Sequence, residues 1–358
     1  MKIAIIGSGI SGATAARLMR DAGHEVRILE ARGHIAGNCY DEDREGVRVH
    51  CYGPHLFHTN DAWVWNFLSR FTEWNAYEHR VVADTGLGRI SIPYNLRTET
   101  QLGRRLSDEE IRELIFVEYS EKQWGVPWSE MPAAIKGRVP MRRENEDDRY
   151  FTDRFQGQPR EGYTAMFQRM LEGIPVELGV GKEEWRKRKG EMDLVIYTGK
   201  VDEYFGYVYG RLPYRSLRFE HERSAVWLPF AQINQCNGLP FTRMYDHRWL
   251  NGQGVGDDVS RPGLEGSLAG AGLVTSLSTA KETILTREYP LVHDRTNEPY
   301  YPMPFGEGMA LYQRYKLLAE EEPNTLFIGR LATYSYLDMW MAVAQAMAKL
   351  RGIAGVGG

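Results

Sequence analysis

The sequence predicts an α/β fold that begins with a Rossmann-like dinucleotide-binding domain, and three observations predict it. The apolar run Ile3–Ile6 is long enough for one buried parallel strand. It continues directly into Gly7-x-Gly9-x-x-Gly12, and a helical stretch follows. A second strand over 25–29 is closed by the acidic residue Glu30. The glycine motif alone is weak evidence, but these parts in this order favour a dinucleotide site over a glycine-rich turn in an unrelated α/β protein.

Each residue of the motif has a physical task. Gly7 permits the tight turn, Gly9 lets the backbone approach a pyrophosphate, and Gly12 lets the following helix pack on the strand. That helix is expected to end near Gly23. Glu30 can accept hydrogen bonds from the ribose hydroxyls of an adenosine.

The residues after the second strand favour FAD over NAD. The segment Glu30-Ala-Arg32-x-x-x-x-Gly37-Asn38 resembles the motif that follows this strand in many flavoproteins. The resemblance implies that Arg32 and the small residues carry the chain along the pyrophosphate and ribose of FAD. The predicted fold class is therefore an FAD-binding Rossmann-like domain with an inserted helical domain and an antiparallel β-sheet domain.

Composition sets the limits of this interpretation. The 358 residues allow about two domains and a substantial core. No run approaches the ~18 apolar residues that span a bilayer, and no basic N-terminal region precedes the first strand, so we expect a cytoplasmic protein without a signal peptide or membrane partner. The net charge of −4 argues against a nucleic acid partner but allows a nucleotide ligand.

Cysteine and histidine spacing argues against two further classes. Cys39, Cys51 and Cys236 form no CxxC pair, so we expect reduced thiols and disfavour a flavin–disulfide reductase. The histidines between residues 50 and 58 fit no common zinc pattern, so we expect no metal and predict a loop that holds imidazoles against a ligand or the backbone.

Along the chain, we expect a discontinuous FAD-binding domain over 1–62, 175–213 and 322–358. A mainly helical region that carries the substrate loop and dimer contacts is expected over 63–135, and an antiparallel sheet domain over 136–174 and 214–321. Local patterns predict a helix over 61–71 with Trp63 on its apolar face, a hairpin over 77–94, and strands over 175–180 and 193–197. Ser107-x-x-Glu110 is a capping box, 251–278 reads as a long Gly- and Ser-rich insertion, and a last helix is expected over 338–350.

From Lys2 to Arg351 the sequence resembles the UDP-galactopyranose mutase family. Many ordered blocks carry the resemblance: Gly7–Gly12, Gly37-Asn38, His55-Leu-Phe-His58-Thr-Asn60-Asp61, Tyr119–Gly125, Arg138-Val-Pro, Tyr150–Gly157, Gly162-Tyr163, Thr242-Arg243, Glu298–Pro302 and Gly329–Asp338. Together these blocks are far more specific than any one of them.

The resemblance implies roles at matched positions. Tyr119 would stack on uracil, Trp124 would begin a mobile substrate loop, and Arg138 and Arg243 would grip the diphosphate, which Arg donors suit. The implied catalytic set is Arg138, Arg243, His55 and His58. The implied substrate-binding set is Tyr119, Trp124, Tyr150, Asn234, Tyr301, Tyr336 and His79. The implied cofactor-binding set is Gly7, Gly9, Ser11, Gly12, Glu30, Arg32, Gly37, Asn38, His55, His58, Arg330, Leu337, Asp338 and Met339.

The activity implied by the resemblance is a pyranose–furanose interconversion of a nucleoside-diphosphate sugar without net redox change. N5 of reduced FAD would form a covalent adduct with the sugar, and NAD(P)H or another external reductant would keep the flavin reduced. The N-terminus of the last helix, at Asp338, would favour negative charge on the flavin.

Departures from the family pattern leave the substrate and the oligomer open. Ala36 replaces a usual Gly, Pro54 a usual Ala, His79 an Asn near the sugar and Leu337 a Tyr, which favours an altered sugar or a different base. The region 95–119 is shorter than usual, so the possible homodimer is in doubt. Two alternative functions stay open: an amine-oxidase-like FAD oxidoreductase, and a nucleotide-sugar-binding protein without catalysis.

Overall fold

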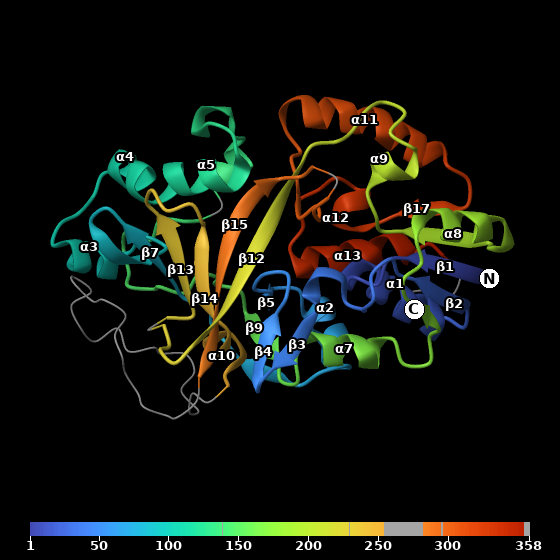
Figure 1. The fold of residues 1–358 in the computed structure, drawn as a ribbon, viewed down its shortest axis with the longest axis horizontal. Helices are drawn as coiled ribbons and strands as arrows, with labels where there is room; N and C mark the ends of the chain where they lie inside the picture. Colours follow the sequence, from blue (N-terminus) through green and yellow to red (C-terminus); the bar gives the residue numbers. More distant parts are fainter. Residues whose placement is uncertain (138, 229, 254–281, 295, 354–358) are drawn as a thin grey trace.

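The protein is built from two lobes, one around a parallel sheet and one around long, mainly antiparallel strands (Figure 1). The computed structural model describes residues 1–137, 139–228, 230–253, 282–294 and 296–353. The expected insertion over 251–278 lies largely outside the described residues, and Arg138 lies outside them as well.

The parallel sheet confirms the predicted Rossmann-like domain. Its strand order is β10-β2-β1-β11-β17, and every described pair is parallel. The strands are β1 (Lys2–Ile6), β2 (Glu25–Leu29), β10 (Val176–Glu177), β11 (Leu194–Tyr197) and β17 (Thr325–Phe327). The central position of β1 places the glycine motif at the carboxyl edge of the sheet, where open α/β sheets bind ligands.

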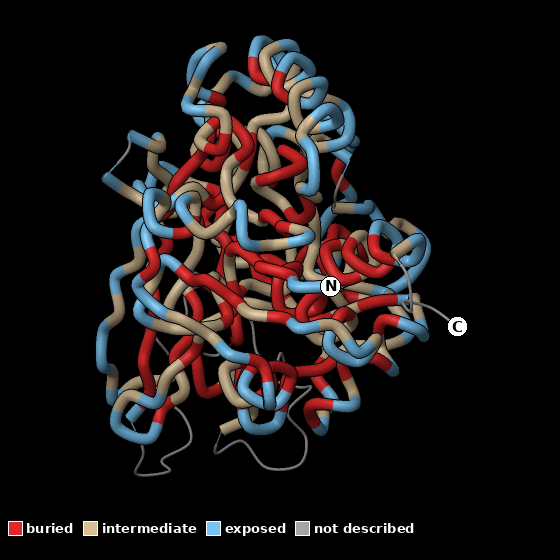
Figure 2. The backbone as a smooth tube through the Cα atoms, turned by 90° about the vertical axis from the view of Figure 1, so that its right-hand side faces the viewer, coloured by how far each residue is buried: buried red, intermediate tan, exposed pale blue. Residues whose placement is uncertain are grey.

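Helices cover both faces of this sheet because its strands alternate two sets of apolar side chains. Ile3 and Ile5 pack against helices of one layer, whereas Ala4 and Ile6 pack against the other. The first layer contains α1 (Ile10–Asp21), α2 (Ala62–Ser69), α7 (Tyr163–Met170) and α13 (Met339–Leu350). The second contains α8 (Lys182–Arg188), α9 (Val201–Tyr204) and α11 (Gly306–Glu321). Figure 2 shows the buried segments in the interior and the exposed ones on the outer helices and loops.

The second lobe is organised by a mixed sheet whose order in the described residues is β16-β12-β15-β14-β13-β7-β8. Its strands are β7 (Val81–Thr85), β8 (Gly88–Ile92), β12 (Tyr214–Ser224), β13 (Gln232–Cys236), β14 (Arg243–Asp246), β15 (Thr283–Val292) and β16 (Tyr301–Pro302). A helical segment packs on the face that carries Val81 and Ala83. It consists of α3 (Leu96–Leu102), α4 (Asp108–Ile111), a π-helical turn (Arg112–Val117) and α5 (Glu118–Trp124).

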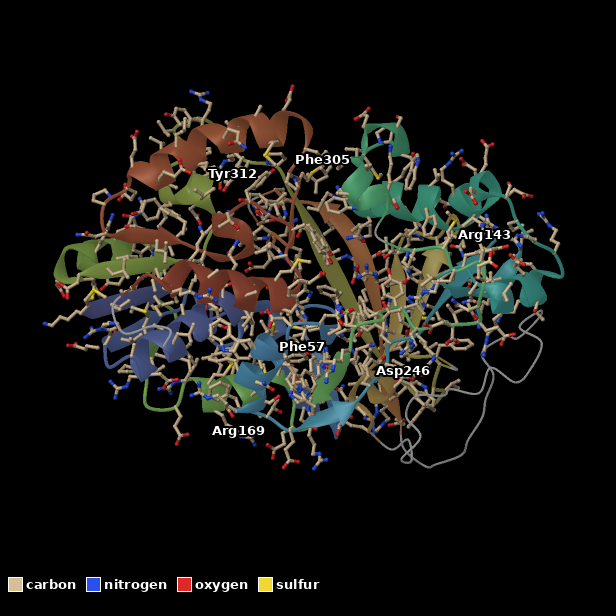
Figure 3. All side chains as sticks on the ribbon, turned by 180° about the vertical axis from the view of Figure 1, so that it is seen from behind. Phe57, Arg143, Arg169, Asp246, Phe305 and Tyr312 are labelled. Carbon is tan, nitrogen blue, oxygen red and sulfur yellow. The ribbon has the colours of Figure 1, made fainter. Side chains whose placement is uncertain are left out.

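Smaller elements join the two lobes. A three-stranded sheet is formed by β5 (Phe57–Thr59), β9 (Phe155–Pro159) and β6 (Trp74–Ala76), and a two-stranded sheet by β3 (Asp41–Arg44) and β4 (Val47–His50). The short helices are α6 (Ala133–Lys136), α10 (His247–Asn251) and α12 (Gly329–Ala332). Phe57, labelled in Figure 3, is buried where β5 meets the first helical layer.

Most local predictions are confirmed, with three differences. Ser107 and Glu110 form the predicted capping box, and the predicted hairpin is β7–β8, which joins the large sheet. Trp63 was placed on the apolar face of its helix but is 51% exposed, because Val64, Phe67 and Leu68 form the buried stripe of α2. The strand expected over 175–180 is limited to β10, and α7 and α11 were not predicted. The predicted domain boundaries stay a prediction.

Candidate active site

Two adjoining cavities contain nearly all the residues to which the sequence points. The first, of about 330 Å³, opens at the carboxyl edge of the parallel sheet around the glycine motif. The second, of about 230 Å³, lies against the large sheet beneath α5. Six residues line both cavities: Asn38, His55, Tyr300, Arg330, Asp338 and Met339.

In the first cavity, segments of backbone approach one another so closely that they leave no space for side chains. Gly7 has a φ of 101°, which favours glycine. A Cβ at Gly37 would lie 2.9 Å from the Cα of Gly9, and one at Gly12 would lie 2.0 Å from the carbonyl oxygen of Gly7. This cradle of bare backbone amides, followed directly by α1, fits the pyrophosphate of a dinucleotide.

Glu30 and Arg32 supply the polar groups of the first cavity. One Glu30 oxygen accepts hydrogen bonds from the backbone N–H and the hydroxyl of Ser8, at 2.7 and 2.6 Å, and the other accepts from the Arg32 N–H at 2.8 Å. The Arg32 guanidinium donates through Nη2 to Asn38 and Glu298, both at 2.9 Å. Its buried Nη1 has no partner, so this end of the cavity retains a cationic donor for an anionic ligand.

His55 faces both cavities as a neutral imidazole. Its Nδ1–H donates to the Gly53 carbonyl at 2.9 Å, so Nε2 is the acceptor nitrogen of the ring. Burial lowers the pKa of His55 to about 3. His50 holds the backbone in place, because its Nδ1 accepts from the His55 N–H at 3.1 Å while its Nε2 is bonded to Asn251.

A row of side chains crosses three neighbouring strands of the large sheet beside the second cavity. The register aligns Asn234 of β13 with Arg243 of β14, and Arg243 with Glu288 of β15. Nη1 of Arg243 lies 3.5 Å from Oε1 of Glu288, which is 1% exposed. Burial raises the pKa of Glu288, and the Arg243 charge opposes that rise. Nε of Arg243 donates to the hydroxyl of Tyr119 at 2.7 Å, so the guanidinium is fixed between strand and helix.

The helix α5 forms the opposite side of the second cavity and presents Tyr119, Gln123 and Trp124 to it. Trp124 packs at a tilt against Tyr301 and Tyr336, both with ring centroids at 6.1 Å, and edge-on against Phe305 at 5.9 Å. Figure 3 places Phe305 between α5 and the start of α11. The amide oxygen of Gln123 is buried without a partner, so it is an acceptor that a ligand can satisfy.

Arg330 joins the two cavities. It donates through Nη1 to the Tyr300 carbonyl at 3.1 Å and lies over the rings of Tyr301 and Tyr336, at 5.6 and 5.2 Å. These two tyrosine rings stack on each other, with centroids 5.7 Å apart. A positive charge behind two tyrosine rings makes this end of the second cavity suitable for an anionic ligand.

Aromatic rings line the end of the second cavity that contains His58 and His79. His58 stacks on Phe151 at 3.6 Å, and its Nδ1 donates to the Asp153 carboxylate at 2.9 Å. His79 is 2% exposed and is bonded to the Tyr77 hydroxyl at 2.9 Å through Nδ1, with Gln232 as a second side-chain partner. Burial lowers the pKa of His79 to about 3, so its ring is neutral.

Comparison with known proteins decides the family. A family model described as UDP-galactopyranose mutase matches residues 114–336, and one described as an NAD(P)-binding Rossmann-like domain matches 5–71. The chain is 34% identical to the dTDP-fucopyranose mutase of Escherichia coli, over 97% of this chain and 96% of that protein. It is 33% identical to a probable UDP-galactopyranose mutase of Klebsiella pneumoniae, over 96% and 92%.

The chain belongs to the UDP-galactopyranose mutase family. This is a family of flavin-dependent sugar pyranose/furanose mutases, so the protein is an isomerase by descent. The fold agrees: a crystal structure of reduced UDP-galactopyranose mutase superimposes with a TM-score of 0.74 at 14% identity, over 99% of this chain and 96% of that one. Within the described residues every helix is too short or too polar to cross a bilayer.

The predicted residues of this mutase-family site divide into three groups. Those for the cofactor line the first cavity, except His58, which lines only the second. Tyr119, Trp124, Tyr150, Tyr301, Tyr336, His79 and Arg243 line the second cavity. Asn234 does not line it, because its amide oxygen accepts a hydrogen bond from Gln232, which occupies the wall instead. Arg138 lies outside the described residues, so its role stays a prediction.

Sequence reasoning missed several residues of the second cavity, among them Gln123, Gln232 and Glu288. Gln123 lies inside the block Tyr119–Gly125, and its helical spacing of four from Tyr119 places both side chains on one face. Gln232 and Glu288 had no comparable signal, since only the strand register brings them beside the cavity.

Proposed function

We propose that this protein holds FAD in the first cavity and, with the flavin reduced, interconverts the pyranose and furanose forms of a nucleoside-diphosphate sugar in the second. The observation that carries the proposal is the shared edge of the two cavities. There His55 and Arg330 face both a dinucleotide cradle and a cavity with a fixed guanidinium. A ligand in one cavity therefore lies directly against a ligand in the other.

Reduced flavin would supply the nucleophile, N5, that displaces the diphosphate from the anomeric carbon of the sugar, and NAD(P)H or another external reductant would keep it reduced. The chain's own residues bind and orient. Arg243 and the stacked tyrosines Tyr301 and Tyr336 retain the departing diphosphate, which carries about two negative charges. His55 offers an acceptor nitrogen beside the flavin site, and the N-terminus of α13 at Asp338 favours negative charge on the ring.

The α5 side of the second cavity suits a pyrimidine base. Tyr119 provides a ring face for stacking, and the Gln123 carboxamide has an acceptor without a partner. A carboxamide pairs with the imide edge of uracil or thymine, because its oxygen accepts from N3–H while its nitrogen donates to a carbonyl. Both UDP- and dTDP-linked sugars satisfy this pattern.

The His79 end of the second cavity favours a sugar that differs from galactose. Nδ1 of His79 is already bonded to the Tyr77 hydroxyl, and Gln232 lies beside the ring, so little of its hydrogen-bonding capacity is left for a sugar hydroxyl. The faces of His79 and Phe151 suit a methyl group instead. A 6-deoxyhexose such as fucose carries one, and the relative from Escherichia coli is a dTDP-fucopyranose mutase.

The test is a panel of UDP-galactose, dTDP-fucose and a GDP-linked hexose, each incubated with chemically reduced and with oxidised FAD-loaded protein. We expect interconversion only with reduced protein, and preference for the 6-deoxyhexose. A clean preference for UDP-galactose would refute the altered specificity. Oxygen consumption with peroxide release, and no isomerisation of any sugar, would favour the amine-oxidase-like alternative.

The variant Arg243→Ala separates catalysis from simple binding of FAD. Because truncating one partner of a charge-assisted hydrogen-bonded contact costs about 2–5 kcal/mol, we expect turnover to fall by at least about thirtyfold while flavin content is unchanged. Arg218→Ala, an exposed arginine on β12 that lines neither cavity, is the control. Full turnover in Arg243→Ala would contradict the assignment of the second cavity to the diphosphate.

A further inference from the structure

Arg215 is a buried arginine that lines neither cavity, although it is bonded to Gln123, which lines the second. It lies on β12 and is 7% exposed. It forms no ion pair with any carboxylate of the described residues. A buried charge without a counter-charge is costly, and it persists only where other groups compensate it. What compensates Arg215 therefore indicates its task.

The partners of Arg215 are backbone carbonyls at the C-terminal end of α5. Nε donates to the Gln123 carbonyl at 3.0 Å and Nη2 donates to the Lys122 carbonyl at 3.1 Å. The last carbonyls of a helix have no partner within the helix and form its negative end. The guanidinium thus caps α5 at the turn whose side chains Gln123 and Trp124 line the second cavity.

Gly125, the residue that ends α5, is shaped around this guanidinium. Its φ of 69° is in the left-handed region, and a Cβ there would lie 2.5 Å from Nη1 of Arg215. A helix commonly ends on a glycine in this conformation. Here the missing side chain also leaves the space that the Arg215 guanidinium occupies, so the two residues form one contact.

The backbone of Arg215 connects the capped helix to the tyrosines across the cavity. Arg215 pairs with Tyr301 of β16, and its carbonyl accepts from the Tyr300 N–H at 2.9 Å. One residue therefore fixes α5 through its side chain and the Tyr300–Tyr301 segment through its main chain. The ring centroids of Trp124 on one side and Tyr301 on the other are 6.1 Å apart. The distance between the two sides therefore depends on Arg215.

Lys122 secures α5 on the other side. Its Nζ donates to the carbonyls of Gln235, Asn237 and Leu239, at 2.8, 2.6 and 3.0 Å. These carbonyls belong to the end of β13 and the turn that leads to β14, the strand of Arg243. The two cations thus hold α5 against both halves of the sheet that forms the floor of the second cavity.

We propose that Arg215 is a positioning residue of the nucleotide-binding site: it caps α5 and sets the distance between Gln123 and Trp124 on one side and Tyr301 on the other without touching the ligand. The inference rests on the proposed function of the second cavity. It makes the nucleotide affinity, and not the flavin affinity, the property that the Arg215 side chain controls. Among the described residues the guanidinium bonds only to α5, whereas the link to Tyr300, which lines both cavities, is a main-chain bond that a side-chain substitution leaves in place.

The experiment compares FAD-loaded wild-type protein with Arg215→Met, Arg215→Lys, Gly125→Ala and the control Arg218→Met. The dissociation constants for UDP and dTDP are measured by calorimetry, together with flavin content and thermal midpoint. We expect Arg215→Met to weaken the better nucleotide by about tenfold, about 1.4 kcal/mol, with flavin content unchanged. Arg215→Lys keeps a cation and should be intermediate, Gly125→Ala should mimic Arg215→Met, and Arg218→Met should match wild type.

Coupling gives a second measurement. If Gly125 acts through the guanidinium, adding Gly125→Ala to Arg215→Met should weaken binding by less than it does in the wild-type background. With a favoured sugar nucleotide, KM should rise more than kcat falls, since the reacting groups are untouched.

The outcomes separate the inference from the proposed function. If wild-type protein binds neither UDP nor dTDP, the proposed function fails and the inference fails with it. If wild type binds and Arg215→Met binds equally well, or loses flavin in proportion to affinity, only the positioning role of Arg215 is overturned. If Arg215→Met does not fold, Gly125→Ala decides: a wild-type nucleotide affinity in that variant overturns the inference.

Discussion

Replacing Arg243 with Met should destabilise the protein in a way that depends on pH, because it leaves the Glu288 carboxylate buried without a cation. Arg243 Nη1 lies 3.5 Å from Glu288 Oε1, and the Glu288 side chain is 1% exposed. Burial already raises the pKa of Glu288, and among its neighbours the Arg243 charge and the Thr242 hydrogen bond lower it. Without the guanidinium, burial prevails and the pKa rises further.

The size of the effect follows from the cost of protonation. An uncompensated buried charge costs about 3–5 kcal/mol, but the carboxyl can protonate instead. Protonating a group whose ordinary pKa is 4.5 costs about 3.4 kcal/mol at pH 7 and about 1.4 kcal/mol at pH 5.5, at about 1.36 kcal/mol per unit. When folding raises the pKa of a group, the stability that this group contributes is complete below its pKa in the unfolded chain. That contribution is lost as the pH rises toward its pKa in the folded protein. The penalty of Arg243→Met should therefore shrink by up to about 2 kcal/mol between pH 7 and pH 5.5.

Urea unfolding of FAD-loaded protein at both pH values measures this penalty. Arg243→Met/Glu288→Gln should recover most of the lost stability at pH 7, because it removes the stranded charge. Arg287→Met is the control: it is the neighbour of Glu288 on β15 and pairs with Glu222 at 2.7 Å on the surface, so it should cost less than about 1 kcal/mol at either pH. Equal penalties for Arg243→Met at the two pH values, or no recovery in the double variant, would refute the reasoning.

Three further predictions address the cofactor cradle, a helix cap and a buried histidine. Gly37→Ala should abolish bound flavin absorbance because its Cβ would lie 2.9 Å from Gly9 Cα, whereas Gly46→Ala, also at positive φ but with open space around it, should keep it. Asp61→Ala removes an oxygen that accepts from two N–H groups at the start of α2, at 2.8 and 3.2 Å, and should lower the free energy of unfolding by about 1 kcal/mol without changing turnover. His79 has a pKa near 3 in the folded protein, below its ordinary 6.5, so its contribution to stability is lost as pH falls. Between pH 6.5 and pH 5, the free energy of unfolding should fall by about 2 kcal/mol less in His79→Phe than in the wild type.

The Rossmann-like domain could be predicted because its information is local. The strand, the three glycines, the helix and Glu30 follow one another within thirty residues, and each type is required by its own position. The capping box at Ser107 could be predicted for the same reason. Trp63 was misplaced because an eight-residue helix whose second and fourth residues are tryptophans admits two apolar stripes. Packing against the first helical layer selects the stripe with Val64.

The second cavity could be predicted only where residue identity was enough. Tyr119 and Arg243 stand in distinctive blocks. The pairing of Arg243 with Glu288, however, depends on the register between β14 and β15, because a shift of one residue would place their side chains on opposite faces of the sheet. Arg215 is a stronger case, since its task depends on where β12 begins relative to α5, about ninety residues earlier in the chain. A sequence can supply the groups that touch a ligand, whereas the residues that hold those groups at the correct separation are chosen by strand register and helix packing. Gln123 combines the two cases. Its spacing from Tyr119 can be read from the sequence, but its buried acceptor is held toward the cavity only because Arg215 binds the carbonyl at that turn of α5.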